Sequence, residues 1–285
     1  MKKIILLIIM CFTLTGCFEG TNFNDNKTYV TIYPIEYIAD YLYSDYSEIK
    51  SIYPNEINIE EYSLTEKQKN NYSKGNKFIY NGISNEVDLA VEFLNKNKNL
   101  EIIDTMKNMN YKYGIEELWL DPSHYLMMAR NVKESLIDYE DNIYTKEKIE
   151  EKYGELKITI SEIDVDLTMI GKNASYHNII VANEVLSFLS KYNINVVSLD
   201  TNNSEYEKNY KTALTLASDE EVLYLYKLKG YELTDSLNSL VNTYDLEVIE
   251  IDNMVNLTEE QRKNGENYIT IMNDNIDNLK KELLK

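Results

Sequence analysis

Short apolar runs alternate with amphipathic segments through the first third of the chain. The apolar runs predict strands at 28–33, 49–53, 78–80 and 100–103. Helices are predicted between them, over 35–42, 65–73 and 87–94. Pro34 is expected to close the first strand. Strands that alternate with helices favour a parallel sheet covered on both faces.

The middle of the chain carries the longest apolar repeat. Asp121 and Pro122 form an N-cap and first-turn pair, which predicts a helix over 123–136. Beyond it, apolar side chains recur every three or four residues, at Ile149, Tyr153, Leu156, Ile160, Ile163, Leu167 and Ile170. Ile158 and Ile160 also alternate as they would in a strand, but the longer repeat predicts one helix over 146–170.

The alternation of strands and helices resumes in the last third of the chain. Strands are predicted at 179–182, 196–199, 222–226 and 247–251. Helices are predicted over 183–192 and 234–244, with a final amphipathic helix that includes 269–283. We therefore expect an α/β protein of two lobes, each a mainly parallel β-sheet flanked by helices, joined by a long rigid central helix. A cleft between two such lobes is a common place for a ligand.

The first seventeen residues, MKKIILLIIMCFTLTGC, have the pattern of an export signal. Lys2 and Lys3 precede an apolar run that is too short to remain as a membrane-spanning helix. The run ends in Leu-Thr-Gly-Cys, which resembles a bacterial lipobox with Cys17 as the lipidated residue. Lipid chains on Cys17 would hold the mature protein on the extracytoplasmic face of the cell membrane. An ordinary signal peptide or membrane anchor is the alternative.

These patterns divide the chain into five segments. They are a lipoprotein signal peptide (1–16), a lipidated tether (17–26), an N-terminal α/β lobe (27–122), linking helices that include the central one (123–172) and a C-terminal α/β lobe (173–285).

Composition and charge exclude several classes of function. The formal net charge is −19 over 285 residues, and removal of Lys2 and Lys3 with the signal makes it −21. A chain this acidic is repelled by the phosphates of nucleic acid. His124 and His177 are the two histidines, so a site of three histidines is impossible, and both are expected at the surface. The sequence contains no GxSxG, HExxH or glycine-rich phosphate loop, and we expect a protein that is not an enzyme.

Five local patterns occur in a fixed order. They are Tyr33-Pro34, Tyr80-Asn81-Gly82 followed by Glu86, Trp119-Leu120-Asp121-Pro122, the strand–helix–strand segment 179–199 with its Lys-Tyr-Asn-Ile, and the run of Tyr268, Met272, Asn275 and Leu279. Together they resemble the metal-binding solute-binding lipoproteins of bacterial zinc/manganese ABC transporters (cluster A-I, the lipoprotein receptor-adhesin family). The resemblance covers nearly all of the mature chain, and the WLDP and NGxxxE patterns are its most specific parts.

The resemblance implies a divalent metal ion, zinc or manganese, held between the lobes and passed to an ABC permease in the membrane by a monomeric protein. Two family histidines are replaced by glutamate in this sequence. The third ligand position falls on Asn183, Glu184 or Asp200, of which we take Asp200. The expected metal ligands are Glu60, Glu117, Asp200 and Asp252.

A site made of carboxylates changes the expected cation. Imidazole ligands suit zinc, whereas oxygen ligands suit manganese, magnesium or calcium, so this set favours manganese. Three interpretations stay open: a carboxylate-rich metal site, a family member whose metal binding is lost or altered, and a misalignment in loops rich in glutamate. The functional alternative is a surface lipoprotein on the same scaffold, with a degenerate metal site and an adhesive or different ligand-binding role.

Overall fold

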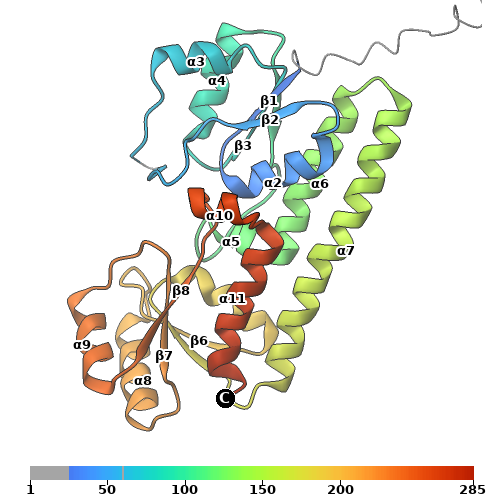
Figure 1. The fold of residues 1–285 in the computed structure, drawn as a ribbon. Coiled ribbons are helices and arrows are strands. Elements are labelled where there is room, and N and C mark those ends of the chain that lie inside the picture. Colours follow the sequence, from blue (N-terminus) through green and yellow to red (C-terminus); the bar gives the residue numbers. More distant parts are fainter. Residues whose placement is uncertain (1–25, 60) are drawn as a thin grey trace, which may run out of the picture.

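The computed structural model describes residues 26–59 and 61–285, which form two α/β lobes joined by helices (Figure 1). The predicted signal peptide, Cys17 and the predicted ligand Glu60 lie outside the described residues. Within those residues, no helix combines the length and the apolar character that a membrane span requires.

The N-terminal lobe is built on a four-stranded parallel sheet in the order β2-β1-β3-β4. Its strands are β1 (Lys27–Val30), β2 (Glu48–Ser51), β3 (Lys77–Tyr80) and β4 (Glu101–Asp104). Its connecting helices are α2 (Tyr33–Tyr43), α3 (Glu66–Tyr72) and α4 (Glu86–Lys96). The strand predicted over 28–33 is shorter than expected. It ends at Val30, and Pro34 lies in the first turn of α2. Proline fits there because the first N–H groups of a helix make no intrahelical hydrogen bond.

Three helices link the lobes: α5 (Glu117–Leu120), α6 (Pro122–Tyr139) and α7 (Ile143–Asn173). Asp121 caps α6 as predicted, because its carboxylate accepts the Ser123 N–H at 2.9 Å. Every position of the predicted apolar repeat is buried in α7 except Tyr153, which is half-buried. The long central helix is thus confirmed, three residues longer than predicted at each end.

The C-terminal lobe repeats the plan of the first. Its parallel sheet has the order β6-β5-β7-β8, with β5 (Asn178–Val181), β6 (Asn195–Ser198), β7 (Tyr224–Leu228) and β8 (Glu247–Ile251). Its helices are η2 (Glu184–Tyr192), α8 (Tyr206–Ser218), α9 (Asp235–Tyr244), α10 (Glu259–Asn264) and α11 (Tyr268–Leu283). The predicted fold class is therefore confirmed, lobe by lobe.

This lobe differs from the prediction at three elements: η2, α8 and α10, the last of which was not predicted. The segment after β5 forms a 3-10 helix rather than the predicted α-helix. Helix α8 was not predicted, because its buried face consists of Ala213, Leu216 and Ala217, two of which are too small to produce a clear apolar period.

One apolar core runs through both lobes. Alternate strand residues point to opposite faces of each sheet, so Val30 and Val181 enter this shared core while Tyr29 and Ile180 enter outer cores. The shared core also contains the buried faces of α2, α6, α7 and α11. Gly171 of α7 allows a very close approach, because a Cβ there would lie 1.7 Å from the Tyr192 carbonyl oxygen.

An aromatic junction of Trp119, Tyr125 and Tyr268 joins the lobes at the centre of the molecule. The rings of Tyr125 and Tyr268 stack with centroids 3.8 Å apart. The Tyr125 hydroxyl donates to the Pro34 carbonyl at 2.8 Å, and the Tyr268 hydroxyl donates to the Trp119 carbonyl at 2.7 Å. The Trp119 indole in turn donates to the carbonyl of Asn253 at 2.6 Å. The WLDP motif therefore connects α5 to the segment after β8.

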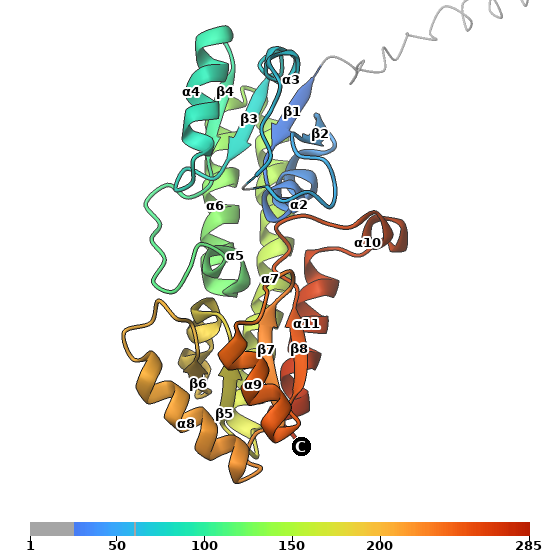
Figure 2. The same ribbon diagram turned by 90° about the vertical axis from the view of Figure 1, so that its left-hand side faces the viewer.

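A second link crosses between the lobes beside α10, which lies next to α2 in both views (Figure 2). The Arg262 guanidinium donates to both oxygens of Glu36 at 2.8 and 2.9 Å and to Asn55 at 2.6 Å. A bidentate pair of this kind fixes orientation as well as distance. The lobes are thus held by directed contacts in addition to the shared core.

Tyr268→Phe tests the aromatic junction. The variant keeps the stacked ring but leaves the buried Trp119 carbonyl without its donor, which should lower the free energy of unfolding by about 1–3 kcal/mol. Urea denaturation followed by tryptophan fluorescence measures this, since Trp119 is the only tryptophan. Tyr144→Phe is the control, because Tyr144 is 77% exposed and its loss of a hydroxyl should change stability by less than about 0.5 kcal/mol. Equal urea midpoints for Tyr268→Phe and Tyr144→Phe would contradict a stabilising role of the hydrogen bond between Tyr268 and Trp119.

Candidate functional site

The carboxyl ends of the two sheets face each other across the middle of the molecule. The Tyr33 N–H, just beyond β1, donates to the Val255 carbonyl beyond β8 at 3.1 Å. The Asn256 side chain donates to the carbonyl of Pro54, beyond β2, at 2.7 Å. In each sheet the strand order also reverses direction at its centre, between β1 and β3 and between β5 and β7. Such switch points are where α/β proteins place ligands.

Glu117 lies at the start of α5, between the two sheets. Its side chain is buried, and one carboxylate oxygen accepts the N–H groups of Lys112 and Tyr113 at 3.0 and 2.8 Å. The other oxygen lies 3.5 Å from His124 Nδ1. Glu117 therefore fixes the loop before α5 with one oxygen and presents the other to an imidazole nitrogen.

His124 departs from the expectation of a surface side chain. Its Nδ1 atom is buried and has no hydrogen-bond partner among the described residues, although the Glu117 and Asp121 carboxylates lie 3.5 and 4.0 Å away. The sequence missed this proximity because a break between α5 and α6 separates the two residues. His177, by contrast, lies at the surface as predicted, with Nδ1 3.0 Å from the Asn193 carbonyl oxygen.

Glu184 and Asp200 form an acidic pair at the carboxyl ends of β5 and β6. An Asp200 oxygen accepts the Glu184 N–H at 3.3 Å. Burial, and then the neighbouring Asp200 charge, raise the pKa of Glu184, while the Lys112 ammonium opposes them. Lys112 comes from the loop that Glu117 holds, and Tyr113, Glu117 and Glu184 all raise its pKa. Its ammonium is thus in electrostatic reach of carboxylates from both sides of the inter-lobe region.

The side chains of Asn183 and Asp252, two further candidate ligands, are engaged in hydrogen bonds within the C-terminal lobe. The Asn183 side chain accepts the Leu228 N–H at 2.9 Å, which ties the end of β5 to the end of β7. One Asp252 oxygen accepts the Met254 N–H at 2.8 Å. The other accepts from Gln261 Nε2 at 2.9 Å and from Lys229 Nζ at 3.0 Å. Three protein donors therefore hold the Asp252 carboxylate, two on one oxygen and one on the other.

The predicted ligands do not meet as one ready-made site in the part of the chain that the structure describes. No group of three or more histidine, cysteine, aspartate or glutamate side chains there has an arrangement suited to a metal ion. Of the four predicted ligands, Glu60 lies outside the described residues, and Glu117, Asp200 and Asp252 each serve a local hydrogen bond. Their role as metal ligands stays a prediction.

Glu86, the acidic residue of the NGxxxE motif, lies at the switch point of the N-terminal sheet. It is 3% exposed, and its carboxylate accepts the Asn81 N–H at 2.8 Å. Burial raises its pKa from 4.5 to about 7, although the Asn81 N–H and the hydroxyls of Thr31 and Tyr53 favour the charged form. The glycine of the motif is also explained, because a Cβ on Gly82 would collide with the carboxylate of Asp104.

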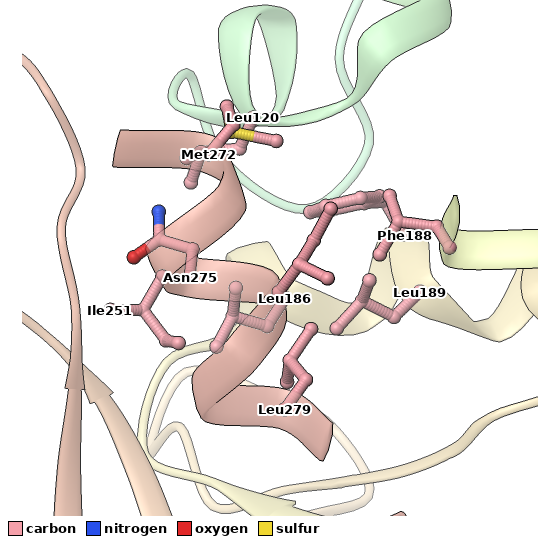
Figure 3. A pocket seen from close by; sticks show the side chains of 10 residues that line it. Leu120, Leu186, Phe188, Leu189, Ile251, Met272, Asn275 and Leu279 are labelled. Carbon is pink, nitrogen blue, oxygen red and sulfur yellow. The ribbon is translucent and has the colours of Figure 1, made fainter. Parts of the chain in front are cut away.

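A small cavity behind Asp252 does not offer a second site. Figure 3 shows its lining side chains, which come from α5, α7, η2, β8 and α11 and are apolar apart from Asn275. Both polar atoms of the Asn275 side chain bond the Asp252 backbone, at 2.9 Å each. A volume of about 20 Å³ holds roughly one water molecule. The cavity is therefore a packing void of the core.

Comparison with known proteins identifies the scaffold. The family model for ZnuA, described as "Zinc-uptake complex component A periplasmic", matches residues 29–282. No curated protein sequence matches the chain. The structure resembles the Zn(II)-bound ZnuA-like domain of Streptococcus pneumoniae AdcA, with a TM-score of 0.73, 18% identity and coverage of 92% of this chain and 100% of that domain.

Two further structures have the same fold. The metal-dependent lipoprotein YcdH from Bacillus subtilis gives a TM-score of 0.75 at 18% identity, covering 91% of this chain and 100% of that one. An Mn-bound mutant of the periplasmic metal binding protein from Candidatus Liberibacter asiaticus gives a TM-score of 0.71 at 12% identity, covering 90% and 100%. At these identities the likeness establishes the fold alone.

The buried Glu86 predicts a specific pH dependence. Its raised pKa means that the folded chain keeps a proton that the unfolded chain releases above about pH 4.5. The free energy of unfolding should therefore fall as pH rises from about 4.5 to 7, by up to about 3 kcal/mol. Glu86→Gln should remove this part of the pH dependence, as measured by urea denaturation at several pH values. Glu207→Gln, at an exposed position of α8, should leave it in place. Parallel pH profiles for wild type and Glu86→Gln would contradict the assignment.

Proposed function

The chain belongs to the family of the periplasmic component A of zinc-uptake complexes, and we propose that it binds a divalent cation between its lobes for an ABC transporter. Members of this family are solute-binding components of zinc and manganese transporters. In this proposal the chain performs no chemistry on its ligand. It captures the cation outside the cytoplasm and delivers it to a membrane permease.

The observation that carries the proposal is the acidic pair of Glu184 and Asp200 at the carboxyl ends of β5 and β6, with Lys112 in electrostatic reach of both Glu184 and Glu117. Glu117 comes from the linking helices, whereas Glu184 and Asp200 come from the C-terminal lobe. Repulsion from Asp200 contributes to the raised pKa of Glu184, which is the electrostatic signature of an acidic pair with too little positive charge nearby. A divalent cation would relieve that repulsion.

We propose Glu60, Glu117, Asp200 and Asp252 as the ligand set, with Glu184 as the alternative to Asp200. Oxygen donors of this kind favour manganese over zinc. His124 could add one nitrogen, since its buried Nδ1 lies 3.5 Å from Glu117. Similar proteins of this fold include a Zn(II)-bound domain and an Mn-bound protein, so both cations belong in the test.

Cation-dependent stabilisation of the mature chain, residues 18–285, tests this proposal. After chelator treatment, a cation held at a hundred times its dissociation constant should stabilise the fold by about 2.7 kcal/mol, which is several degrees in Tm. Thermal unfolding with Mn²⁺, Zn²⁺, Fe²⁺, Mg²⁺, Ca²⁺ and Ni²⁺ compares the candidates. Glu117→Gln should abolish the shift, because an amide cannot replace a charged ligand.

Glu147→Gln is the matched control, since it removes one negative charge from an exposed position of α7. It should keep the full cation-induced shift. A panel without any shift in the wild-type chain would reject metal binding. It would favour the second candidate, a surface lipoprotein on the same scaffold, which the occupied carboxylates of Asp252 and Glu117 support.

We also propose that Cys17 is lipidated and anchors the protein to the membrane. Cys17→Ser should move the protein from the membrane fraction to the soluble extracytoplasmic fraction of a bacterial host. It should also prevent incorporation of a labelled fatty acid. Cys11→Ser, within the same signal, should change neither result. Membrane association of both variants would indicate an uncleaved anchor instead.

A further inference from the structure

Asp252 carries a positively charged partner at the place where the proposed function puts a cation. Lys229 Nζ lies 3.0 Å from Asp252 Oδ2, the oxygen that also accepts from Gln261 Nε2. The opposite oxygen holds the Met254 N–H. A metal ion that binds Oδ2 must therefore displace one of its two donors, whereas Oδ1 accepts a single backbone N–H.

The three donors differ in how easily they can leave. Gln261 is 9% exposed and belongs to the capping box of α10, where its side chain also accepts the Thr258 N–H at 3.0 Å. The Met254 donor is a backbone group. The Lys229 side chain is 42% exposed, and its backbone is held separately, by a 2.9 Å bond from its N–H to the Ile251 carbonyl. Only the lysine can rotate away without disturbing the loop.

The surroundings of Lys229 would receive the displaced ammonium. Lys229 and Asp252 line an open cavity of about 250 Å³ together with Glu250, Glu266 and Asp274. These carboxylates offer the ammonium other negative charges within the same cavity. The next residue, Gly230, has a φ of +82° and open space around it, so it does not hinder the movement.

We propose that Lys229 is a built-in counter-ion of Asp252 that a cation must displace to bind Oδ2, so that Lys229 acts as a charge filter at this site. The inference rests on the proposed function. A monovalent cation would replace one unit charge by another and gain little Coulomb energy, whereas a divalent cation gains twice the attraction at a shorter distance. Displacing Lys229 costs the same for every cation, so Lys229 lowers every affinity by a similar factor. A monovalent cation, which gains little Coulomb energy at Asp252, then no longer binds, whereas a divalent cation still does. It is a positioning residue, because it acts through Asp252.

The test is isothermal titration of the chelator-treated mature chain with Mn²⁺ and with Zn²⁺ at fixed ionic strength. Lys229→Met should lower the dissociation constant about three- to fivefold, because the cation no longer competes with a partly exposed ion pair. Lys229→Arg keeps the charge and should stay close to wild type. The same titrations are repeated with Na⁺ as the background cation instead of a large organic cation. Na⁺ should weaken Mn²⁺ and Zn²⁺ binding to Lys229→Met more than to wild type, because Na⁺ then has no lysine to displace at Asp252.

Lys227→Met is the matched control. Lys227 lies two residues earlier on β7 and pairs with Glu250 at 2.8 Å, which is not a predicted ligand. The Lys227→Met substitution should change the dissociation constant for Mn²⁺ or Zn²⁺ less than about twofold. A second background, Asp252→Asn, should abolish the effect of Lys229→Met, since the lysine acts through that carboxylate. Thermal unfolding of each metal-free variant verifies that it is folded.

The outcomes separate this inference from the proposed function. If wild type and Lys229→Met bind with equal affinity, the charge filter is overturned and the proposed function stands. If only Lys229→Met binds, the filter is supported in its strongest form. If no variant binds any cation, the proposed function fails and this inference fails with it.

Discussion

The shared apolar core is the constraint on which the rest of the molecule depends. Each sheet buries one face against the same set of helices, so the two lobes are not separate bodies joined by a flexible linker. The aromatic junction and the Arg262–Glu36 pair add directed bonds across the boundary. Opening a cleft by rotating the lobes would expose this core and break those bonds. Ligand entry must therefore depend mainly on side chains and loops at the facing ends of the sheets.

Electrostatics at those ends follow from the excess of carboxylates in the chain. Isolated buried charges are costly, and the structure balances them in three ways. Backbone N–H groups satisfy Glu117, a protonated form is favoured for Glu86, and the Lys229 ammonium neutralises Asp252. Glu184 and Asp200 repel each other, and the Lys112 ammonium compensates Glu184 only in part. The inter-lobe region thus keeps negative charge beside Glu184 and Asp200.

The two most specific motifs of the sequence have structural roles in this molecule. Trp119 and Asp121 of WLDP connect α5 to the C-terminal lobe and cap α6. In NGxxxE, Gly82 admits the Asp104 carboxylate, and Glu86 holds the turn that begins at Asn81. Both motifs position the ends of strands and helices around the inter-lobe region. They identify the scaffold more securely than they identify its ligand.

The sequence by itself determined the two-lobed α/β class, the central helix and the N-cap at Asp121. These depend on local periodicity and on residues such as Asp121 whose partners lie within one turn. Its resemblance to the family also pointed to Glu117 and Asp252 as ligand positions. Only the tertiary structure decided what their carboxylates bind, because Lys229, Gln261 and His124 approach them from other elements. Side-chain partners of that kind depend on the relative position of whole helices and strands, which no local pattern encodes.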